Sequence, residues 1–220
     1  MRARLALCLA AASAALLGVA APAAAQTECR NLTSCSSRTS PWIAVPPQAA
    51  VDEGLAGPAS YAFPCPTGRY AAGFDWEPVN VDELLLDVPY NNWGATAPVF
   101  LLRTDDRRPG AAQIDIGCVP TPAGSRTAPL EAGATLRMTE RRVRPARELK
   151  VRQRCEAGET ATQSGGALLF ETVAAPTQRL LRGFALEVSD GRAGASATVL
   201  TEEYVGDDER VVLHVYAVCV

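Results

Sequence analysis

The chain has few of the residues that support common catalytic chemistry. Its 220 residues include one His and two Met, and only 6% are aromatic. A Ser-His-acid triad would therefore need His214 as its base, and the sequence has no Gly-x-Ser-x-Gly motif. Phosphate-binding loops and dinucleotide-binding glycine motifs are also lacking. These absences argue against serine hydrolase, nucleotide and redox chemistry. Residues 211–219 are apolar on both faces of the strand that they are predicted to form. We therefore expect His214 to be a packed, structural histidine.

Long hydrophobic runs are also scarce, and the one present lies at the start. Arg2 and Arg4 precede an apolar run at 5–19, and Ala23-Ala24-Ala25 follows it. This order is typical of a secretory signal peptide cleaved before Gln26, and the run is too short for the ~20 apolar residues of a membrane span. The sequence therefore predicts an extracellular or cell-envelope protein with no transmembrane segment after cleavage.

Cysteine is the most informative residue type that is present. Six cysteines follow the leader, and an even number in an exported chain is typical of disulfides. Zinc would need other ligands, because no Cys-x-x-Cys pair occurs and His214 is the only imidazole. We therefore predict three disulfides, no metal and no cofactor. The six cysteines are Cys29, Cys35, Cys65, Cys118, Cys155 and Cys219.

Internal repetition selects among the 15 possible pairings of six cysteines. Two similar units each open with a strand ending in Cys-x-x-Gly, at Cys65 and Cys155, and each closes with a strand ending in Cys. Alternation places these thiols on the same strand faces as aliphatic side chains, so we expect the first and last strands of each unit to be bridged. The predicted pairs are Cys65–Cys118 and Cys155–Cys219, with Cys29–Cys35 by elimination.

Between the cysteines, short runs bounded by Pro, Gly or Asn predict β-strands, and no long helical period occurs. The predicted fold is all-β: two similar disulfide-stapled β-sandwich-like units preceded by a short N-terminal disulfide loop. Residues 105–110 and 206–210 each precede a closing strand, so both are interpreted as turns of a final hairpin. The predicted divisions are a signal peptide (1–25), an N-terminal arm (26–57), β unit 1 (58–120), a linker and basic segment (121–147) and β unit 2 (148–220).

Charge is unevenly distributed along a chain whose formal net charge is −3. Residues 137–154 contain seven Arg and Lys150 but only two Glu. Alternation turns Lys150, Arg152 and Arg154 outward, and we interpret them as a contact for an anionic polymer, extended by Arg141, Arg142 and Arg144. Under the alternative interpretation, acidic residues at 202–209 neutralise this stretch within the protein.

A second candidate surface combines aromatic and amide side chains, which carbohydrate-binding surfaces use. If this surface does not bind sugar, two of its aromatic residues, Tyr90 and Trp93, instead cover the hydrophobic core at a turn formed by residues 89–94. Asp75 and Glu77, which are separated by Trp76, share one face of the predicted strand. A glycoside hydrolase requires such a pair of carboxylates. The candidate sugar-binding residues are Trp76, Tyr90, Asn91, Asn92 and Trp93.

Several short motifs, in this order, carry a resemblance: residues 29–35, 41–46, 65–68, 73–75, 117–120 and 216–219. Together they resemble a group of uncharacterised secreted proteins from high-GC, actinobacteria-like bacteria. The chain differs from that pattern at Ala72, where Gly is expected, and at Glu156, where Pro is expected. The resemblance implies export and a β architecture, but no catalytic residues.

Taken together, the sequence predicts a secreted or cell-envelope-associated, non-enzymatic binding or structural module. Its expected partner is a cell-envelope polysaccharide or an anionic polymer, and not nucleic acid. The alternative function is a carbohydrate-active hydrolase that uses Asp75 and Glu77.

Overall fold

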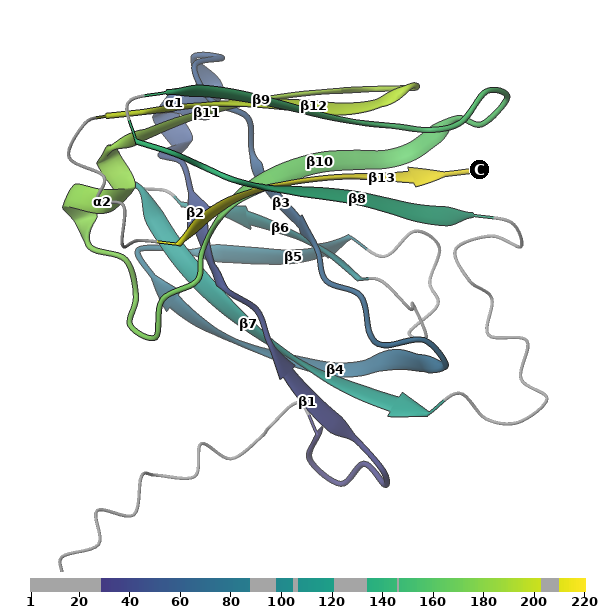
Figure 1. Cartoon of the computed structure of the whole chain (residues 1–220). Helices are drawn as coiled ribbons and strands as arrows, with labels where there is room; N and C mark the ends of the chain where they lie inside the picture. The colour runs from purple at the N-terminus through teal and green to yellow at the C-terminus, as the bar shows by residue number, and fades with distance from the viewer. Residues whose placement is uncertain (1–28, 88–97, 105–106, 121–133, 146, 203–209) are drawn as a thin grey trace, which may run out of the picture.

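The computed structural model describes residues 29–87, 98–104, 107–120, 134–145, 147–202 and 210–220 (Figure 1). In the first half the elements are β1 (Ser36–Thr39), β2 (Trp42–Val45), α1 (Gln48–Asp52), β3 (Ala59–Ala62), β4 (Arg69–Val79), β5 (Glu83–Asp87), β6 (Val99–Arg103) and β7 (Gly110–Pro120). In the second half they are β8 (Thr135–Arg142), β9 (Glu148–Arg154), β10 (Ala161–Phe170), α2 (Gln178–Arg182), β11 (Phe184–Gly191), β12 (Gly194–Thr201) and β13 (Val211–Cys219). The prediction of an all-β protein is confirmed. The expected signal peptide lies outside the described residues.

The strands form three antiparallel sheets. The large sheet has seven strands in the order β1-β7-β2-β10-β13-β8, with β4 also paired to β7. The inner sheet has the order β3-β6-β5, and the outer sheet has the order β11-β12-β9. Strand β2 pairs with both β7 and β10. The N-terminal segment therefore joins strands of the two predicted units in one sheet.

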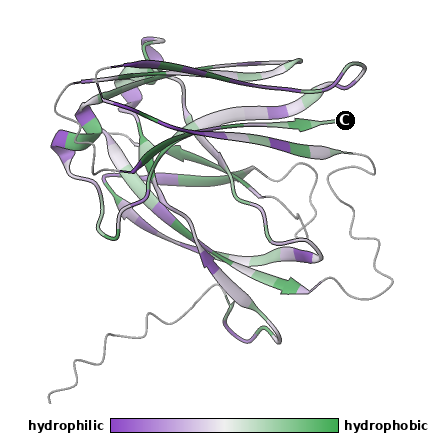
Figure 2. Cartoon of the chain, in the orientation of Figure 1, coloured by the Kyte–Doolittle hydropathy of each residue, from purple (hydrophilic) through white to green (hydrophobic). Residues whose placement is uncertain are grey.

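The two three-stranded sheets lie on opposite sides of β10, β13 and β8, which are the large-sheet strands from the second half of the chain. The outer sheet covers one side of β10, β13 and β8, and the inner sheet lies between these strands and the β4–β7 part of the large sheet (Figure 1). Leu213 and Val215 of β13 pack toward the outer sheet, whereas Tyr216 and Val218 contact Ala62 and Val99 of the inner sheet. Because both faces of β13 are covered, its sequence is apolar at consecutive positions (Figure 2).

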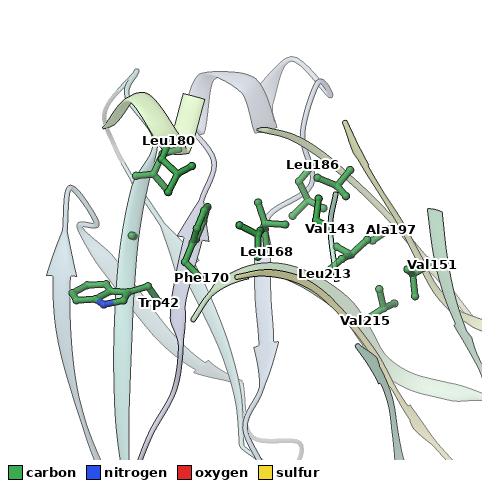
Figure 3. Close-up of a cluster of buried hydrophobic side chains, with 14 of the residues drawn as sticks. Trp42, Val143, Val151, Leu168, Phe170, Leu180, Leu186, Ala197, Leu213 and Val215 are labelled. Atoms are coloured by element: carbon green, nitrogen blue, oxygen red, sulfur yellow. The ribbon is translucent and has the colours of Figure 1, made fainter. Parts of the chain in front are cut away.

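Besides the small cluster around Tyr216 and Val218, two larger hydrophobic clusters hold the layers together. The first joins the large sheet to the outer sheet and includes Leu168, Leu213, Val151 and Ala197 (Figure 3). The second joins the large sheet to the inner sheet through fully buried residues such as Phe100 and Ile114. Burying a side chain of this size contributes about 1.5–3 kcal/mol.

All three predicted disulfides are confirmed. The Cα–Cα distances are 5.6 Å for Cys29–Cys35, 5.7 Å for Cys65–Cys118 and 5.5 Å for Cys155–Cys219. Cys65 follows the inner strand β3, and Cys155 follows the outer strand β9; their partners lie in β7 and β13 of the large sheet. Each long bridge therefore ties a three-stranded sheet to the large sheet.

The chain visits the sheets in the same order in its two halves. Strands β2, β4 and β7 belong to the large sheet and β3, β5 and β6 to the inner sheet. Strands β8, β10 and β13 again belong to the large sheet, and β9, β11 and β12 to the outer sheet. Strand β8 lies within the segment that the sequence indicated as linker and basic segment, and it pairs with β13.

The two predicted closing hairpins are wrong. Strand β6 pairs with β3 and β5, whereas β7 pairs with β1, β2 and β4, so the connection at 104–109 crosses from the inner sheet to the large sheet. Strand β12 pairs with β9 and β11, whereas β13 pairs with β8 and β10. Residues 105–106 and 203–209 of these connections lie outside the described residues.

Candidate anion-binding face

Strand β9 presents its cations on the outer face of the outer sheet. Val151 packs into the core, and Leu149 packs against it from a partly buried position. Their neighbours Lys150, Arg152 and Arg154 are exposed. Alternate side chains of a strand lie on one face, so these three cations form a row spaced by about 6.8 Å per pair of residues. The hydrophilic colouring of β9 at the top of the molecule follows this pattern (Figure 2).

Small polar residues lie beside this row. On β12, Thr198 lies opposite Lys150 and Ser196 lies opposite Arg152. On β11, Ser189 is paired with Ser196. The row therefore has hydroxyl groups beside it.

A shallow groove of about 370 Å³ lies at one end of this face. Its polar lining residues are Arg152, Arg154, Arg192, Ser189, Ser196 and Asp190. We call Lys150, Arg152, Arg154 and Arg192, together with the two serines, the basic face. Guanidinium groups bind carboxylate and phosphate oxygens well, and the hydroxyls supply further donors.

The acids that the structure describes form no ion pair with the four cations of the basic face. Of the acids at 202–209 that the alternative interpretation invokes, those at 203–209 lie outside the described residues. The nearby acids are Glu148 on β9, Glu187 on β11 and Asp190 in the groove. Glu187 lies two strands from Lys150, about 10 Å away at the usual strand spacing. Glu148 and Glu187 are thus the acids nearest Lys150. The other end of the face carries three arginines with Asp190 beside them, so among the described residues it is the more positive end.

The β11–β12 turn brings Arg192 to the groove, and the sequence analysis missed this residue. Gly194 has a φ of +123°, and a Cβ atom there would lie 2.1 Å from the carbonyl oxygen of Gln153. Glycine thus permits the close approach of β12 to β9. The turn is fixed because Cys155 N donates to Ala193 O at 3.1 Å and Ala161 N donates to Arg192 O at 2.8 Å. The Gly-Arg-Ala-Gly sequence of the turn was the available signal.

The other arginines of the basic stretch, including the expected extension by Arg141, Arg142 and Arg144, do not lie on β9. Arg141 and Arg142 belong to β8 of the large sheet, and Arg144 follows β8. Arg137 pairs with Glu156 at 2.8 Å and with Glu159 at 3.1 Å. The hydrogen bond from the Glu156 amide, followed by that from Arg137, lowers the pKa of Glu159. Arg137 is therefore neutralised within the protein.

The candidate sugar surface is described only in part. Trp76 is half-buried and packs against the inner hydrophobic cluster. Tyr90, Asn91, Asn92 and Trp93 lie outside the described residues.

The two candidate hydrolase acids, Asp75 and Glu77, are exposed on β4, where Asp75 lies opposite Asp115. Neither acid is among the described lining residues of the groove of the basic face or of two further grooves of about 400 and 450 Å³.

His214 is buried, with 1% of its surface exposed. Its Nδ1 atom lies 3.1 Å from Glu140 Oε1, and the ring of Tyr61 packs edge-on at 4.9 Å. Burial is also the main cause that raises the pKa of Tyr61. His214 is thus a packed residue, as the sequence predicts.

The three ligand atoms of Cys155, Glu159 and Cys219 lie within 4.8 Å of one another. Both sulfurs are joined in a disulfide, however, and Glu159 is bound to Arg137. Cysteine binds a metal ion as a thiolate, so the two disulfide-bonded sulfurs are not metal ligands and act as a structural bridge.

Comparisons with known proteins yield no relatives: no family model, curated protein or solved structure matches the chain. Neither of the helices in the described residues is long and apolar enough to cross a membrane.

Proposed function

We propose that this protein is a secreted or cell-envelope-associated, non-enzymatic module that binds an anionic polymer through its basic face. The observation that carries this proposal is the row Lys150, Arg152 and Arg154 on the outside of β9, with Arg192 beside it and no acid paired to these groups among the described residues.

The shape of the basic face suits an extended ligand better than a small one. The cations lie along one strand, and the groove at the end of the face is shallow and open. A single exposed ion pair contributes only about 0–1 kcal/mol. A polymer that contacts three or four cations at once gains from effective concentration, because each contact holds the next anionic group nearby.

The charge of the remaining chain would orient such a ligand. The protein carries a formal net charge of −3 although the basic face is positive. A polyanion would be repelled by most of the surface and attracted by this face, with an attraction that decays over a Debye length of about 8 Å at physiological ionic strength. Binding should therefore be local and salt-dependent.

Export is supported by the disulfides and by the leader-like N-terminus. Three disulfides persist where the environment is oxidising, as it is outside the cytosol. An envelope polymer with phosphate or carboxylate groups is the class of partner that such a protein would meet there.

Co-sedimentation with purified anionic cell-wall material tests this proposal. We expect the protein to pellet at low salt and to stay in solution at high salt, and Arg152→Gln/Arg154→Gln should abolish pelleting at low salt. The control Arg30→Gln/Arg210→Gln removes the same charge from exposed positions outside these grooves and should pellet like the wild type. Failure of the wild type to pellet at low salt, or equal pelleting of R152Q/R154Q, contradicts the proposal.

A further inference from the structure

A second groove lies on another part of the molecule, between α1, α2, β2 and β11. Its volume is about 450 Å³, which is within the range of small-molecule binding sites. It shares no lining residue with the groove of the basic face. We call it the apolar groove.

The lining of the apolar groove is nearly free of polar side chains. Its walls are aliphatic and aromatic, and its lining residues include no acid. Its larger apolar side chains and rings include Pro46, Pro47, Leu55, Leu181, Phe184 and Leu186. Such walls select a ligand whose buried part is a hydrocarbon.

The α1 side of the groove is incompletely covered. Helix α1 has no buried residue, and Leu55, which follows it, is 62% exposed. An aliphatic side chain at the edge of an apolar groove gains free energy when a hydrocarbon covers it. A ligand chain lying along α1 would provide that cover.

Among the described residues that line the groove, the charged ones are both cationic. Arg107 and Arg182 are exposed, and within the described part of the chain no ion pair joins an acid to either. Gln178 Nε2 donates to the carbonyl of Pro109 at 2.9 Å. This bond ties the segment that carries Arg107 to the helix that carries Arg182.

We propose that the apolar groove binds a free fatty acid of medium chain length, with its alkyl chain against the apolar walls and its carboxylate at Arg107 and Arg182. Charge complementarity selects the head group, because the two charged side chains of the described lining are guanidiniums, which favour a carboxylate over a neutral or cationic head. The proposal does not depend on the anionic-polymer function.

Isothermal titration with octanoate, decanoate and dodecanoate, each below its critical micelle concentration, tests the proposal. We expect saturable binding of one ligand per chain. Affinity should rise about two- to fourfold per added methylene until the groove is filled, and then level off. Decanol and decyltrimethylammonium should bind at least about fivefold more weakly than decanoate.

Matched variants separate the groove from nonspecific adsorption. Arg107→Gln/Arg182→Gln should weaken decanoate about five- to tenfold and leave decanol unchanged. Ala50→Trp fills the groove and should abolish binding, whereas Ala49→Trp on the same helix does not face it and should bind normally. R152Q/R154Q should also bind normally, which distinguishes this site from the basic face.

The proposal is overturned if decanoate shows no saturable binding below micelle formation. It is also overturned if Ala49→Trp and Ala50→Trp have the same effect, or if decyltrimethylammonium binds as tightly as decanoate.

Discussion

Removal of the Glu140 carboxylate should destabilise the protein, because it leaves a buried histidine without its partner. His214 is 1% exposed, and its Nδ1 atom lies 3.1 Å from Glu140 Oε1. A carboxylate can only accept, so Nδ1 donates. The other ring nitrogen, Nε2, is buried and has no hydrogen-bond partner among the described residues. Glu140→Ala would therefore leave both ring nitrogens unpaired.

The expected cost at neutral pH is about 1–3 kcal/mol, the usual penalty for an unsatisfied buried polar group. Because the Glu140 side chain is 56% exposed, solvent screening places the value toward the lower end. The midpoint of thermal unfolding should fall by about 2–4 °C for each kcal/mol in a chain of this length. Glu140→Gln keeps an acceptor oxygen and should cost less than Glu140→Ala.

The effect should depend on pH with a defined sign. The hydrogen bond from His214 is the main cause that lowers the pKa of Glu140, and burial opposes it. A carboxyl group whose folded pKa is lowered stabilises the protein above its unfolded pKa of about 4.3, and this stabilisation is lost as pH falls through the folded pKa. The difference between wild type and Glu140→Ala should therefore be largest near neutral pH and shrink below pH ~4.

Urea unfolding followed by circular dichroism between pH 3 and pH 8 measures this difference. Glu148→Ala, at an exposed position on β9, is the matched control and should change stability little. The reasoning is refuted if Glu140→Ala costs no more than Glu148→Ala, or if its cost is the same at pH 3 as at pH 7.

Two further predictions concern the staples and the turn of the basic face. Replacing both cysteines of Cys65–Cys118 or Cys155–Cys219 by Ala should cost about 4 kcal/mol in each case, and about 2 kcal/mol for Cys29–Cys35, because the sequence separations are 53, 64 and 6. Urea unfolding of the three double variants measures these losses. The prediction is contradicted if removing the Cys29–Cys35 bridge lowers the free energy of unfolding as much as removing either long bridge. Gly194→Ala should destabilise by about 2 kcal/mol or more, whereas Gly191→Ala, with nothing within 4 Å of the added Cβ, should cost less than about 1 kcal/mol. Equal unfolding midpoints for the two glycine variants would show that the close approach of the Gln153 carbonyl does not require glycine at position 194.

The sequence predicted features that depend on local periodicity. The alternation of 149–155 showed which side chains of β9 face inward, and the apolar character of 211–219 showed that β13 is covered on both faces. The disulfides followed because thiols that point inward at the ends of the first and last strands of a unit can meet. These inferences need only the period of a strand and the inward direction of a thiol.

The sequence did not predict which strands are neighbours. A period of two identifies a strand but not its partner, and the short connection between β6 and β7 resembles a hairpin although the two strands lie in different sheets. The partner is selected by packing between layers: Ile114 and Ile116 of β7 belong to the same buried cluster as Phe100 of the inner sheet. Arg192 was missed for the same reason: its nearness to Arg154 depends on the pairing of β12 with β9.

The most direct test of the basic face is the salt dependence of its binding to a soluble polyanion. The affinity for long-chain polyphosphate is measured by fluorescence anisotropy from about 50 to 200 mM salt for wild type, R152Q/R154Q and the charge-matched control R30Q/R210Q. If the cations contact the polymer, the logarithm of the association constant falls linearly with the logarithm of salt concentration. Each lost contact then reduces the slope by about 0.7–0.9. The account predicts a slope shallower by roughly 1.4–1.8 for R152Q/R154Q, and an unchanged slope for the control. No binding at 50 mM salt, or the same slope for wild type and R152Q/R154Q, would contradict it.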